Sequence, residues 1–240
     1  MKIGIIGVTG RVGKKVLANA IQKNIPVVFG SASSSSPFLG YDLGELIDAS
    51  PLNLYVTKTA GAPFDSADIL IDFSLASATE ENMSKAVQHQ KPLLIGTTGY
   101  SEKTFELIQK ASTKIPLLVS ANFSVGIQLC MDAVKILCND AKQIKIIETH
   151  HTTKKDTPSG TSLMFKKALN DKAHIESIRR DDHMGEHTII FDMESERVTL
   201  THTSFSRDIF AQGALKAAEF LIQQPPGLYD MADCLSWTGK

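Results

Sequence analysis

The residues best suited to chemistry lie in one short segment, Glu148-Thr-His-His-Thr-Thr-Lys-Lys-Asp-Thr-Pro-Ser-Gly-Thr161. It combines two histidines, two lysines and two carboxylates. An imidazole, with a pKa of about 6.5, transfers protons near neutral pH, and a lysine ammonium binds or stabilises negative charge. The segment therefore fits proton transfer beside a bound anion, although a solvated loop could have the same composition.

The end of this segment predicts a helix start that binds an anion. Pro158 suits the first turn of a helix, because it has no N–H group to leave unpaired. Gly160 lets a ligand approach the backbone closely, and the Thr161 hydroxyl can add a hydrogen bond. A simple helix cap at Asp156 or Thr157 is compatible with this function. The backbone N–H groups expected to face the anion are those of Ser159, Gly160 and Thr161.

Two regular elements are expected to hold the segment. Ile144–Ile147 has the β-branched composition of a strand, and Ser159–Leu169 has the apolar spacing of a helix. The polar residues are therefore predicted on a loop between two rigid elements, where sites are commonly built. Neighbouring residues of a strand point to opposite faces, so His150 and His151 should differ in their roles. The residues alone do not say which one is the acid.

A strand, a glycine-rich turn, a helix and a second strand open the chain. The turn Gly7-Val-Thr-Gly-Arg-Val-Gly13 lies between a strand at Lys2–Gly7 and a helix at Lys14–Lys23, and Pro26–Gly30 is the next strand. This order is typical of dinucleotide-binding sheets, in which the pyrophosphate lies on the helix N-terminus. Thr9 stands where the usual G-x-G-x-x-G pattern has its middle glycine.

Two glycines of this turn have expected functions. Gly7 is predicted to make the tight turn, and Gly10 is predicted to let the helix and the strand pack closely. A glycine-rich turn alone is weak evidence, but its position in the first strand–helix unit of an alternating chain strengthens it.

A serine-rich stretch, Ser31-Ala-Ser-Ser-Ser-Ser-Pro37, follows the second strand. It reads first as a mobile loop. At the same place, NAD-binding sheets carry an acid that binds the ribose hydroxyls, and none is present here. Small hydroxyl side chains leave room for a 2′-phosphate, and counter-charges lie nearby in sequence, so the stretch favours NADPH over NADH. The candidate counter-charges are Arg11, Lys14 and Lys15.

Strands and helices continue to alternate up to about residue 120. The expected elements are strands at Ala67–Phe73, Pro92–Ile95 and Ile115–Val119 and helices at Ala76–His89 and Ser101–Thr113. Apolar strands without alternation indicate a parallel sheet covered on both faces. Polar turns at Gly96–Tyr100 and Ser120–Gly126 follow two of these strands. Ligands of such sheets bind at the carboxyl ends of the strands.

The pattern changes after Val125, which indicates a second domain. The segments His187–Met193 and Glu196–Ser204 alternate polar and apolar residues, as expected for a hairpin with one less buried face. A helix at Ile209–Gln223 is expected to return to the first domain. The predicted fold is α/β, with a Rossmann-type parallel-sheet domain (residues 1–121 and 209–240) and a smaller α+β domain (residues 122–208).

Composition narrows the class of protein. The net charge of −1 gives no electrostatic reason to expect nucleic acid or anionic membrane as a partner. No apolar run approaches the length of a membrane span. The sequence opens directly on a strand without the regions of a signal peptide, and its three cysteines form no CxxC pair. We therefore expect a cytoplasmic protein with reduced cysteines.

Several motifs, in one order, closely resemble the 4-hydroxy-tetrahydrodipicolinate reductase (dihydrodipicolinate reductase) family. They are Gly7-x-x-Gly-Arg-x-Gly13, Asp72-Phe-Ser74, Gly96-Thr-Thr-Gly99, Ala121-Asn-Phe-Ser-Val-Gly126, Glu148-x-His-His-x-x-Lys-x-Asp-x-Pro-Ser-Gly-Thr161, Gly185-Glu-His-Thr188 and Ser206-Arg207. The resemblance covers nearly the whole chain. It implies an enzyme of lysine and diaminopimelate synthesis, a Rossmann domain with a substrate and oligomerisation domain, and usually a homotetramer.

The resemblance also implies a reaction and roles for particular residues. NADPH or NADH would give a hydride to C4 of a cyclic dicarboxylate, with loss of water. His150 resembles the proton donor/acceptor and Lys154 a second proton donor, while His151, Gly160 and Thr161 resemble substrate contacts. The residues implied for the dinucleotide are Gly7, Val8, Thr9, Gly10, Arg11, Val12, Gly96, Thr97, Thr98, Ser120, Ala121, Asn122 and Phe123.

Two departures from the family pattern stand out. Ser34 and Ser35 replace an acidic–basic pair beside the cofactor ribose, which bears on cofactor preference. The region between the Ser159–Leu169 helix and Gly185 is short, which bears on peripheral contacts. Metal binding by His150 and His151 is not expected, because no third ligand accompanies them at a suitable spacing. The alternatives are another Rossmann dehydrogenase of an amino-acid-derived acid, and a non-catalytic nucleotide sensor of the same fold.

Overall fold

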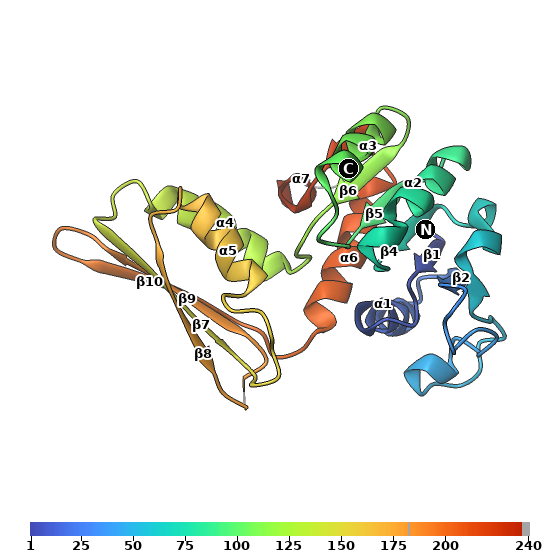
Figure 1. The fold of residues 1–240 in the computed structure, drawn as a ribbon, viewed down its shortest axis with the longest axis horizontal. Helices are drawn as coiled ribbons and strands as arrows, with labels where there is room; N and C mark the ends of the chain where they lie inside the picture. Colours follow the sequence, from blue (N-terminus) through green and yellow to red (C-terminus); the bar gives the residue numbers. More distant parts are fainter. Residues whose placement is uncertain (182, 237–240) are drawn as a thin grey trace. The chain divides into compact units, whose positions relative to one another are not determined.

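The computed structural model describes residues 1–181 and 183–236 and divides the chain into two compact units. Unit 1 comprises Met1–Phe123 together with the chain from Asp208 onward, and unit 2 comprises Ser124–Arg207 (Figure 1). The sequence placed these boundaries one or two residues away, at 121/122 and 208/209. Its first domain ended at residue 240, and residues 237–240 lie outside the described part.

Unit 1 is built on a seven-stranded parallel sheet, as the unalternated apolar strands predicted. In spatial order its strands are β11 (Gly227–Tyr229), β6 (Pro116–Val119), β5 (Leu93–Ile95), β4 (Ile69–Asp72), β1 (Ile3–Ile6), β2 (Val27–Ala32) and β3 (Thr57–Lys58). The chain runs outward from β1 to β3 on one side and from β4 to β11 on the other. The point where strand order reverses, between β1 and β4, is where ligands of such sheets bind.

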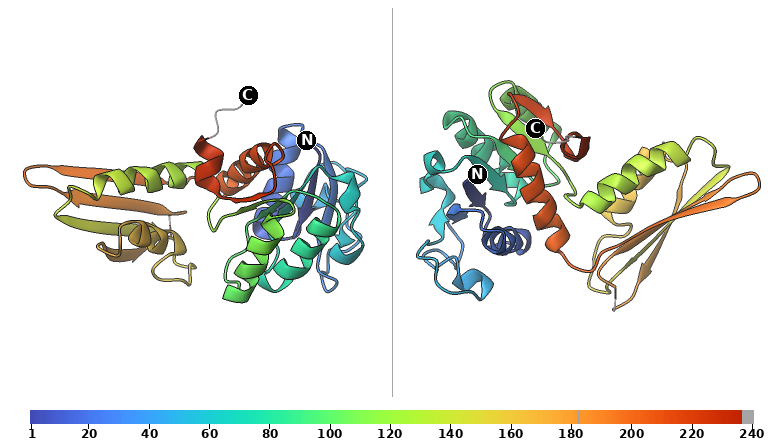
Figure 2. Two further views of the ribbon diagram at one scale, coloured as in Figure 1. Left: turned by 90° about the horizontal axis from the view of Figure 1, so that it is seen from above. Right: turned by 180° about the vertical axis from the view of Figure 1, so that it is seen from behind.

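Helices cover this sheet, as Figure 2 shows from two sides. They are α1 (Arg11–Gln22), α2 (Thr79–Gln88), α3 (Glu102–Ser112), α6 (Asp208–Leu221) and α7 (Met231–Ser236), with short 3-10 turns η1 (Glu45–Ile47), η2 (Thr59–Gly61), η3 (Phe64–Ser66) and η4 (Ala76–Ala78). Helix α1 packs against α6, and α2 packs against α3. The returning helix predicted at Ile209–Gln223 is α6, which contacts β4, β5 and β6. The sequence missed the short elements β3, β11 and α7.

Glycines shape the first turn, although not in the expected division of roles. Gly7 has a φ of +77°, which only glycine adopts readily, so it makes the tight turn. A Cβ atom on Gly13 would lie 2.2 Å from the Gly7 carbonyl oxygen, whereas one on Gly10 would lie 3.2 Å from it. The closest helix–strand approach is therefore at Gly13 rather than at Gly10.

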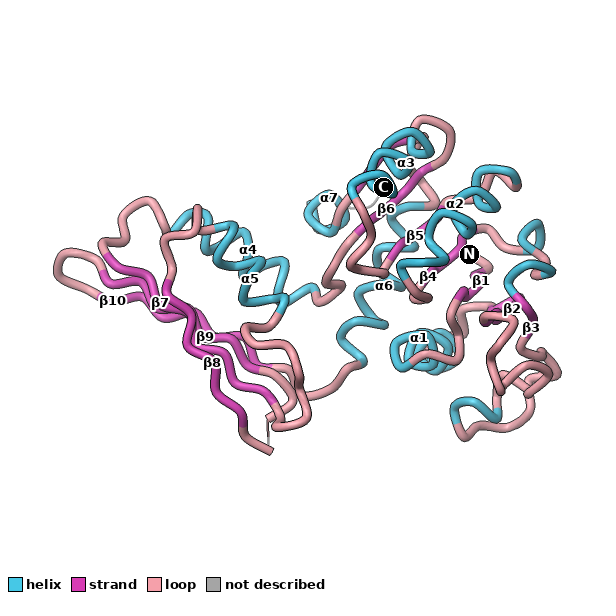
Figure 3. The backbone as a smooth tube through the Cα atoms, viewed as in Figure 1, coloured by secondary structure: helices cyan, strands magenta, loops and turns pink. Residues whose placement is uncertain are grey.

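Unit 2 is a four-stranded mixed sheet with two helices on one face (Figures 2 and 3). Its strands, in spatial order, are β10 (Arg197–Thr203), β9 (Glu186–Asp192), β7 (Gln143–His150) and β8 (His174–Arg179), and its helices are α4 (Val125–Leu137) and α5 (Gly160–Ala168). Strands β9 and β10 form the predicted hairpin. Strand β8 pairs in parallel with β7 and was not predicted from the polar stretch 171–184; residue 182 of that stretch lies outside the described part.

The unit 2 core lies between the helices and the sheet. Phe165 of α5 and Phe191 of β9 are fully buried at its centre, with Ile146 of β7. The other face is less buried, since β10 alternates exposed and half-buried residues. Among the described residues, no helix is both long and apolar enough to cross a bilayer.

Candidate active site

Strand β7 runs three residues further than predicted and carries the first site residues. Glu148 and His150 are its third-last and last residues, so they lie on one face of the sheet and not on a loop. Both are buried, whereas His151 is the first residue beyond the strand and is half-buried. The strand thus ends between the two histidines and gives them different surroundings.

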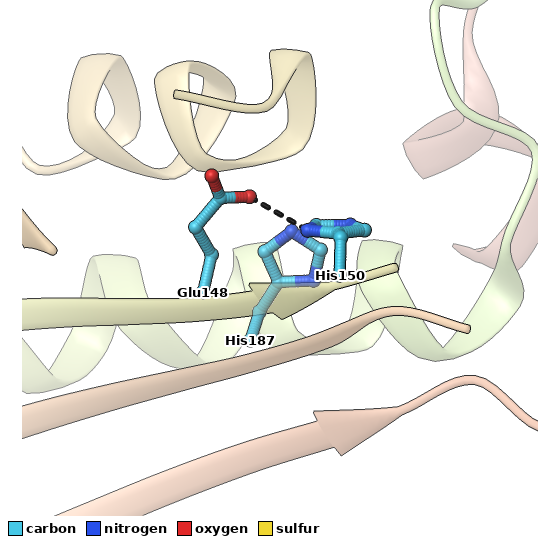
Figure 4. Close-up of side chains that lie close together, drawn as sticks. All are labelled: Glu148, His150 and His187. Carbon is cyan, nitrogen blue, oxygen red and sulfur yellow. Dashed lines mark ion pairs between the residues drawn. The ribbon is translucent and has the colours of Figure 1, made fainter. Parts of the chain in front are cut away.

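The Glu148 carboxylate is the centre of the site. It is fully buried, and its Oε2 lies 2.8 Å from Nδ1 of His150 (Figure 4). Neither atom has a hydrogen-bond partner, so the contact is an ion pair whenever His150 is protonated. Its other oxygen, Oε1, accepts hydrogen bonds from the backbone N–H of Ser159 at 3.2 Å and from Nη2 of Arg179 at 3.1 Å.

These contacts set the pKa values of the pair. Burial acts to raise the pKa of the Glu148 carboxyl, but hydrogen bonds from Ser159, Ser177 and Arg179 outweigh it and hold the pKa below its ordinary value. Burial lowers the pKa of His150, the Glu148 charge offsets this in part, and Lys154 and Arg179 lower it further. The Glu148 carboxylate is therefore a stable anion beside an imidazole that gives up its proton readily.

The helix start differs from the prediction in two respects. Helix α5 begins at Gly160, and Ser159 is its N-cap, accepting a hydrogen bond from the Ser162 N–H. Pro158 therefore precedes the helix and is not in its first turn. The Ser159 N–H is bound to Glu148 and cannot face a ligand. The N–H groups left to bind an anion are therefore those of the first turn of α5. The side of Gly160 is open, since a Cβ there would meet nothing within 4 Å.

Lys154 lies beside this helix start. Its Nζ atom is 2.8 Å from Oδ2 of Asp156. The Lys154 hydrogen bond is the largest cause that holds the pKa of Asp156 below its ordinary value, and the Gly160 N–H contributes. A carboxylate therefore already lies between Lys154 and the helix start, as is favourable for an anion beside a cation and a helix N-terminus.

His151 lines a separate hollow. Its Nδ1 atom is 2.7 Å from the Thr153 hydroxyl, which fixes the ring. Next to it is a cavity of about 250 Å³ that offers histidine and arginine side chains to an anion. Its lining residues are His151, Thr153, Asp181, His183, Met184 and Arg207.

One residue of the site, Arg179, was not identified from the sequence, and a second, His187, was noted only as part of the Gly-Glu-His-Thr motif. Arg179 ends β8, in the stretch that had no assignment. His187 on β9 lies opposite Glu148 in the sheet, and its ring packs edge-on against that of His150 with centroids 5.1 Å apart. Burial and the neighbouring His150 lower the pKa of His187 to about 3, so it is neutral. The Gly-Glu-His-Thr motif was the only signal for His187.

His187 is a third potential metal ligand, beside Glu148 and His150, that spacing in the sequence did not reveal. One potential ligand atom each from Glu148, His150 and His187 lies within 4.8 Å of the others. The single carboxylate is already neutralised by Arg179 at 3.1 Å, so a cation there would meet a positive charge. The arrangement fits proton chemistry better than a resident metal.

The predicted cofactor residues all follow strands of the unit 1 sheet. Since those strands are parallel, the residues share its carboxyl edge. Gly7–Val12 follow β1, Ser34 and Ser35 follow β2, Gly96–Thr98 follow β5, and Ser120–Phe123 follow β6. Two of these residues are buried. The Thr97 hydroxyl lies 3.0 Å from the Thr79 hydroxyl, and the Phe123 ring packs on Phe73. Their side chains therefore support the turns, and their backbone atoms are left to face a ligand.

Helix α1 fits a pyrophosphate. Among the described residues, no side chain caps its start at Gly10, and its first turn holds no acid. Uncapped N–H groups at a helix start bind phosphate oxygens. Of the proposed counter-charges, Arg11 is exposed, Lys14 lies 4.9 Å over the Phe38 ring near the serine turn, and Lys15 pairs with Asp208 at 3.3 Å. Arg11 and Lys14 therefore remain candidates, and Lys15 is engaged by α6.

Two family models cover the chain. The model described as "Dihydrodipicolinate reductase, N-terminus" matches residues 1–123, and "Dihydrodipicolinate reductase, C-terminus" matches residues 124–235. The border between the matches coincides with the first border between the two units, at Phe123/Ser124, while the C-terminal match also includes the part of unit 1 from Asp208 onward.

Curated relatives and a solved structure agree with these matches. A 4-hydroxy-tetrahydrodipicolinate reductase of Pseudoalteromonas atlantica is 36% identical and covers 98% of each chain. That of Zymomonas mobilis is 35% identical, over 98% of this chain and 97% of its own. The dipicolinate-bound dihydrodipicolinate reductase of Paenisporosarcina sp. TG-14 has the same fold, with a TM-score of 0.78 at 20% identity, over 96% of this chain and 97% of its own.

Proposed function

The chain belongs to the dihydrodipicolinate reductase family and is a 4-hydroxy-tetrahydrodipicolinate reductase of diaminopimelate and lysine synthesis, and on this premise we propose how its residues act. When bound, NAD(P)H would supply the hydride for C4 of the substrate ring, with loss of water. The alternatives, a nucleotide sensor and another Rossmann dehydrogenase, do not account for relatives of one activity along the full length.

His150 is the proton donor/acceptor of this reaction. Hydride addition leaves an electron pair on the unsaturated ring that a proton must quench. The observation that carries the assignment is the ion-pair approach of Glu148 to Nδ1 of His150. It stabilises the imidazolium form and leaves Nε2 to face the substrate. Lys154 is a second proton donor and balances negative charge nearby.

The substrate carboxylates are held by the start of α5 and by His151. Gly160 and Thr161 form the first turn of that helix, where N–H groups and the helix dipole attract an anion. Lys154 lies beside this turn, and its contact with the Asp156 carboxylate supports a place for an anion there. His151 contributes a contact from the neighbouring cavity.

A pH profile tests the assignment of His150. Its pKa lies below the ordinary value of 6.5, and a general acid works only while it is protonated. The kcat/KM of the wild type should therefore fall as pH rises through a pKa below 6.5. A bound dicarboxylate adds negative charge and raises that pKa, so the fall in kcat should occur at higher pH. The groups facing His150 are Glu148, Lys154, Asp156, Arg179 and His187.

The control for the profile is His150→Gln, measured over the same pH range. Its residual activity should lack this pH-dependent fall. If the fall persists in the variant, or if the kcat and kcat/KM profiles of the wild type coincide, another group is the acid.

The dinucleotide binds the carboxyl edge of the unit 1 sheet, and NADPH is preferred over NADH. Arg11 and Lys14 provide positive charge at the start of α1, and the serine hydroxyls after β2 leave space for a 2′-phosphate. In Ser34→Asp, a carboxylate would bind ribose hydroxyls and repel phosphate. We expect the ratio of NADPH to NADH dissociation constants to rise by roughly tenfold or more, equivalent to about 1.4 kcal/mol.

Calorimetric titration of both cofactors measures this ratio. The matched control is Ser66→Asp, an exposed serine of η3 that precedes β4 and lies at the amino edge of the sheet. It should leave the ratio unchanged. NADH binding as tight as NADPH binding by the wild type would contradict the preference.

The protein acts as a cytoplasmic homotetramer. Exposed apolar side chains on the unit 2 helices, at Leu129, Ile136 and Leu163, support self-association. The three free, buried cysteines agree with the reducing cytoplasm. Light scattering of the purified protein checks the oligomer, and a monomeric mass would refute it.

A further inference from the structure

One arginine side chain connects three segments of the active site. Arg179 is the last residue of β8, and its Nη2 lies 3.1 Å from Oε1 of Glu148 on β7. The same nitrogen lies 2.7 Å from the Asp156 carbonyl oxygen and 2.8 Å from the Thr157 hydroxyl. Its Nη1 donates to the Ile178 carbonyl oxygen at 2.9 Å, which ties the guanidinium to its own strand.

The Glu148 carboxylate continues this connection in two directions. Its Oε2 lies against Nδ1 of His150, the proton donor. Its Oε1 accepts from the Ser159 N–H, which fixes the residue before the first turn of α5. The Glu148–Arg179 pair therefore contacts both the proton donor and the segment that carries Lys154 and the substrate-binding turn.

The sheet itself places these two residues together. In the parallel pair β7–β8, Arg179 is level with His150 and Ser177 is level with Glu148. Glu148 is fully buried, and the Arg179 side chain is only 20% exposed. A buried carboxylate without a charged partner is strongly disfavoured, so the two side chains must stay paired, and the loop bonded to Arg179 stays with them.

We propose that Glu148 and Arg179 are a positioning pair that sets the distance between the proton donor His150 and the carboxylate-binding start of α5. The proposal rests on the proposed function, because it assumes that His150 and the α5 start act on one substrate. In this role the pair acts through His150 and the α5 start and not by its own contact with the substrate. Their effect is on how precisely a bound dicarboxylate lies against His150, to which transfer rates are sensitive.

The chemistry of arginine explains why this residue type is needed. A guanidinium is planar and holds its two terminal nitrogens in a rigid fork. Because Nη1 is bound to the Ile178 carbonyl oxygen, the direction of Nη2 toward Glu148, Asp156 and Thr157 is fixed. A lysine would neutralise Glu148 as a point charge and lose the fork. The substitution Arg179→Lys therefore separates charge balance from positioning.

The test compares Arg179→Lys with the wild type in three measurements. We expect kcat to fall roughly 10- to 100-fold, as for residues that orient a functional group through a second contact. Dipicolinate, a planar dicarboxylate probe, should bind more weakly by a similar factor. NADPH binding to unit 1 should be unchanged. Arg197→Lys is the matched control, since Arg197 pairs with Asp192 at 2.5 Å in the same sheet and has no part in the site.

A second variant separates positioning from stability. Glu148→Gln/Arg179→Met removes both charges, so it should unfold at a temperature near that of the wild type even if Arg179→Met alone fails to fold. Its turnover should stay at least as low as that of Arg179→Lys. Wild-type kcat and dipicolinate affinity in Arg179→Lys, or wild-type turnover in the double variant, would overturn the proposal.

Failure of the proposed function would look different. In that case the wild type itself would not reduce the substrate, or His150→Gln would retain full turnover. If the wild type and His150→Gln behave as expected and Arg179→Lys is indistinguishable from the wild type, only the positioning role is lost.

Discussion

Replacing His150 by glutamine is expected to lower kcat by roughly two orders of magnitude, the usual contribution of a positioned general acid. Glutamine keeps most of the volume of the ring and can still contact Glu148, so the site should remain folded. It cannot supply the proton that quenches the reduced ring. Because the substrate carboxylates bind elsewhere, at the start of α5 and at His151, the affinity for dipicolinate should change by only a few-fold.

The measurement is steady-state reduction by wild type and variant, with dipicolinate binding measured by calorimetry. His174→Gln is the matched control, since His174 is an exposed residue at the start of β8 in the same unit. It should retain wild-type kcat. Full turnover by His150→Gln would remove His150 from the mechanism and return the choice to His151, which the sequence alone could not decide.

Loss of the Lys154 ammonium is expected to have an effect of similar size. In Lys154→Ala, kcat should fall by roughly two orders of magnitude, because both a proton donor and a charge opposite the substrate carboxylate are gone. Binding should suffer as well, unlike in His150→Gln. Asp156 would lose its contact with Lys154 at 2.8 Å and leave an uncompensated negative charge at the helix start. The affinity for dipicolinate should therefore fall.

Lys155→Ala gives a close control for this variant. Lys155 is the next residue and is exposed, so the same charge is removed from the same loop without touching the pair. Its kcat and dipicolinate affinity should match the wild type. Equal losses in both variants would mean that the loop contributes only a general positive field, and no loss in Lys154→Ala would exclude it as a proton donor.

The cofactor unit was predictable because its signals are local. A glycine turn after an apolar strand specifies both the tight turn at Gly7 and the uncapped start of α1, within ten residues of each other. The helix predicted at Ser101–Thr113 is α3, and its start also follows from a local signal, because the Ser101 side chain caps it by accepting from the Thr104 N–H. The close packing at Gly13 was not, because it depends on how α1 lies over β1.

The substrate site was predictable only in part. Its segment was found from residue types, but the sequence placed Glu148 and His150 on a loop, and the two are the buried end of β7. Glu148, Thr149 and His150 are all polar, so they show no alternation of polar and apolar residues that would mark them as part of a strand. The contacts that hold them in the buried strand come from other parts of the chain. Arg179 and His187 reach Glu148 from β8 and β9, across 31 and 39 residues of sequence. No spacing rule within one segment can reveal such partners.

The helix start shows the same limit at shorter range. Pro158 and Ser159 both suit a helix beginning, and residue types do not say whether Pro158 lies in the first turn or Ser159 is the N-cap. The buried Glu148 carboxylate binds the Ser159 N–H, so that group is not among those left to bind the substrate. A tertiary contact thus changed the number of N–H groups left for the substrate.

The most direct test of the central claim is a coupled reduction assay. Aspartate semialdehyde and pyruvate are condensed by the preceding enzyme to give 4-hydroxy-tetrahydrodipicolinate, this protein is added, and the nicotinamide absorbance is followed. We expect NADPH oxidation that requires every component and is nearly abolished in His150→Gln. Folded wild-type protein that oxidises neither NADPH nor NADH under these conditions would contradict the account.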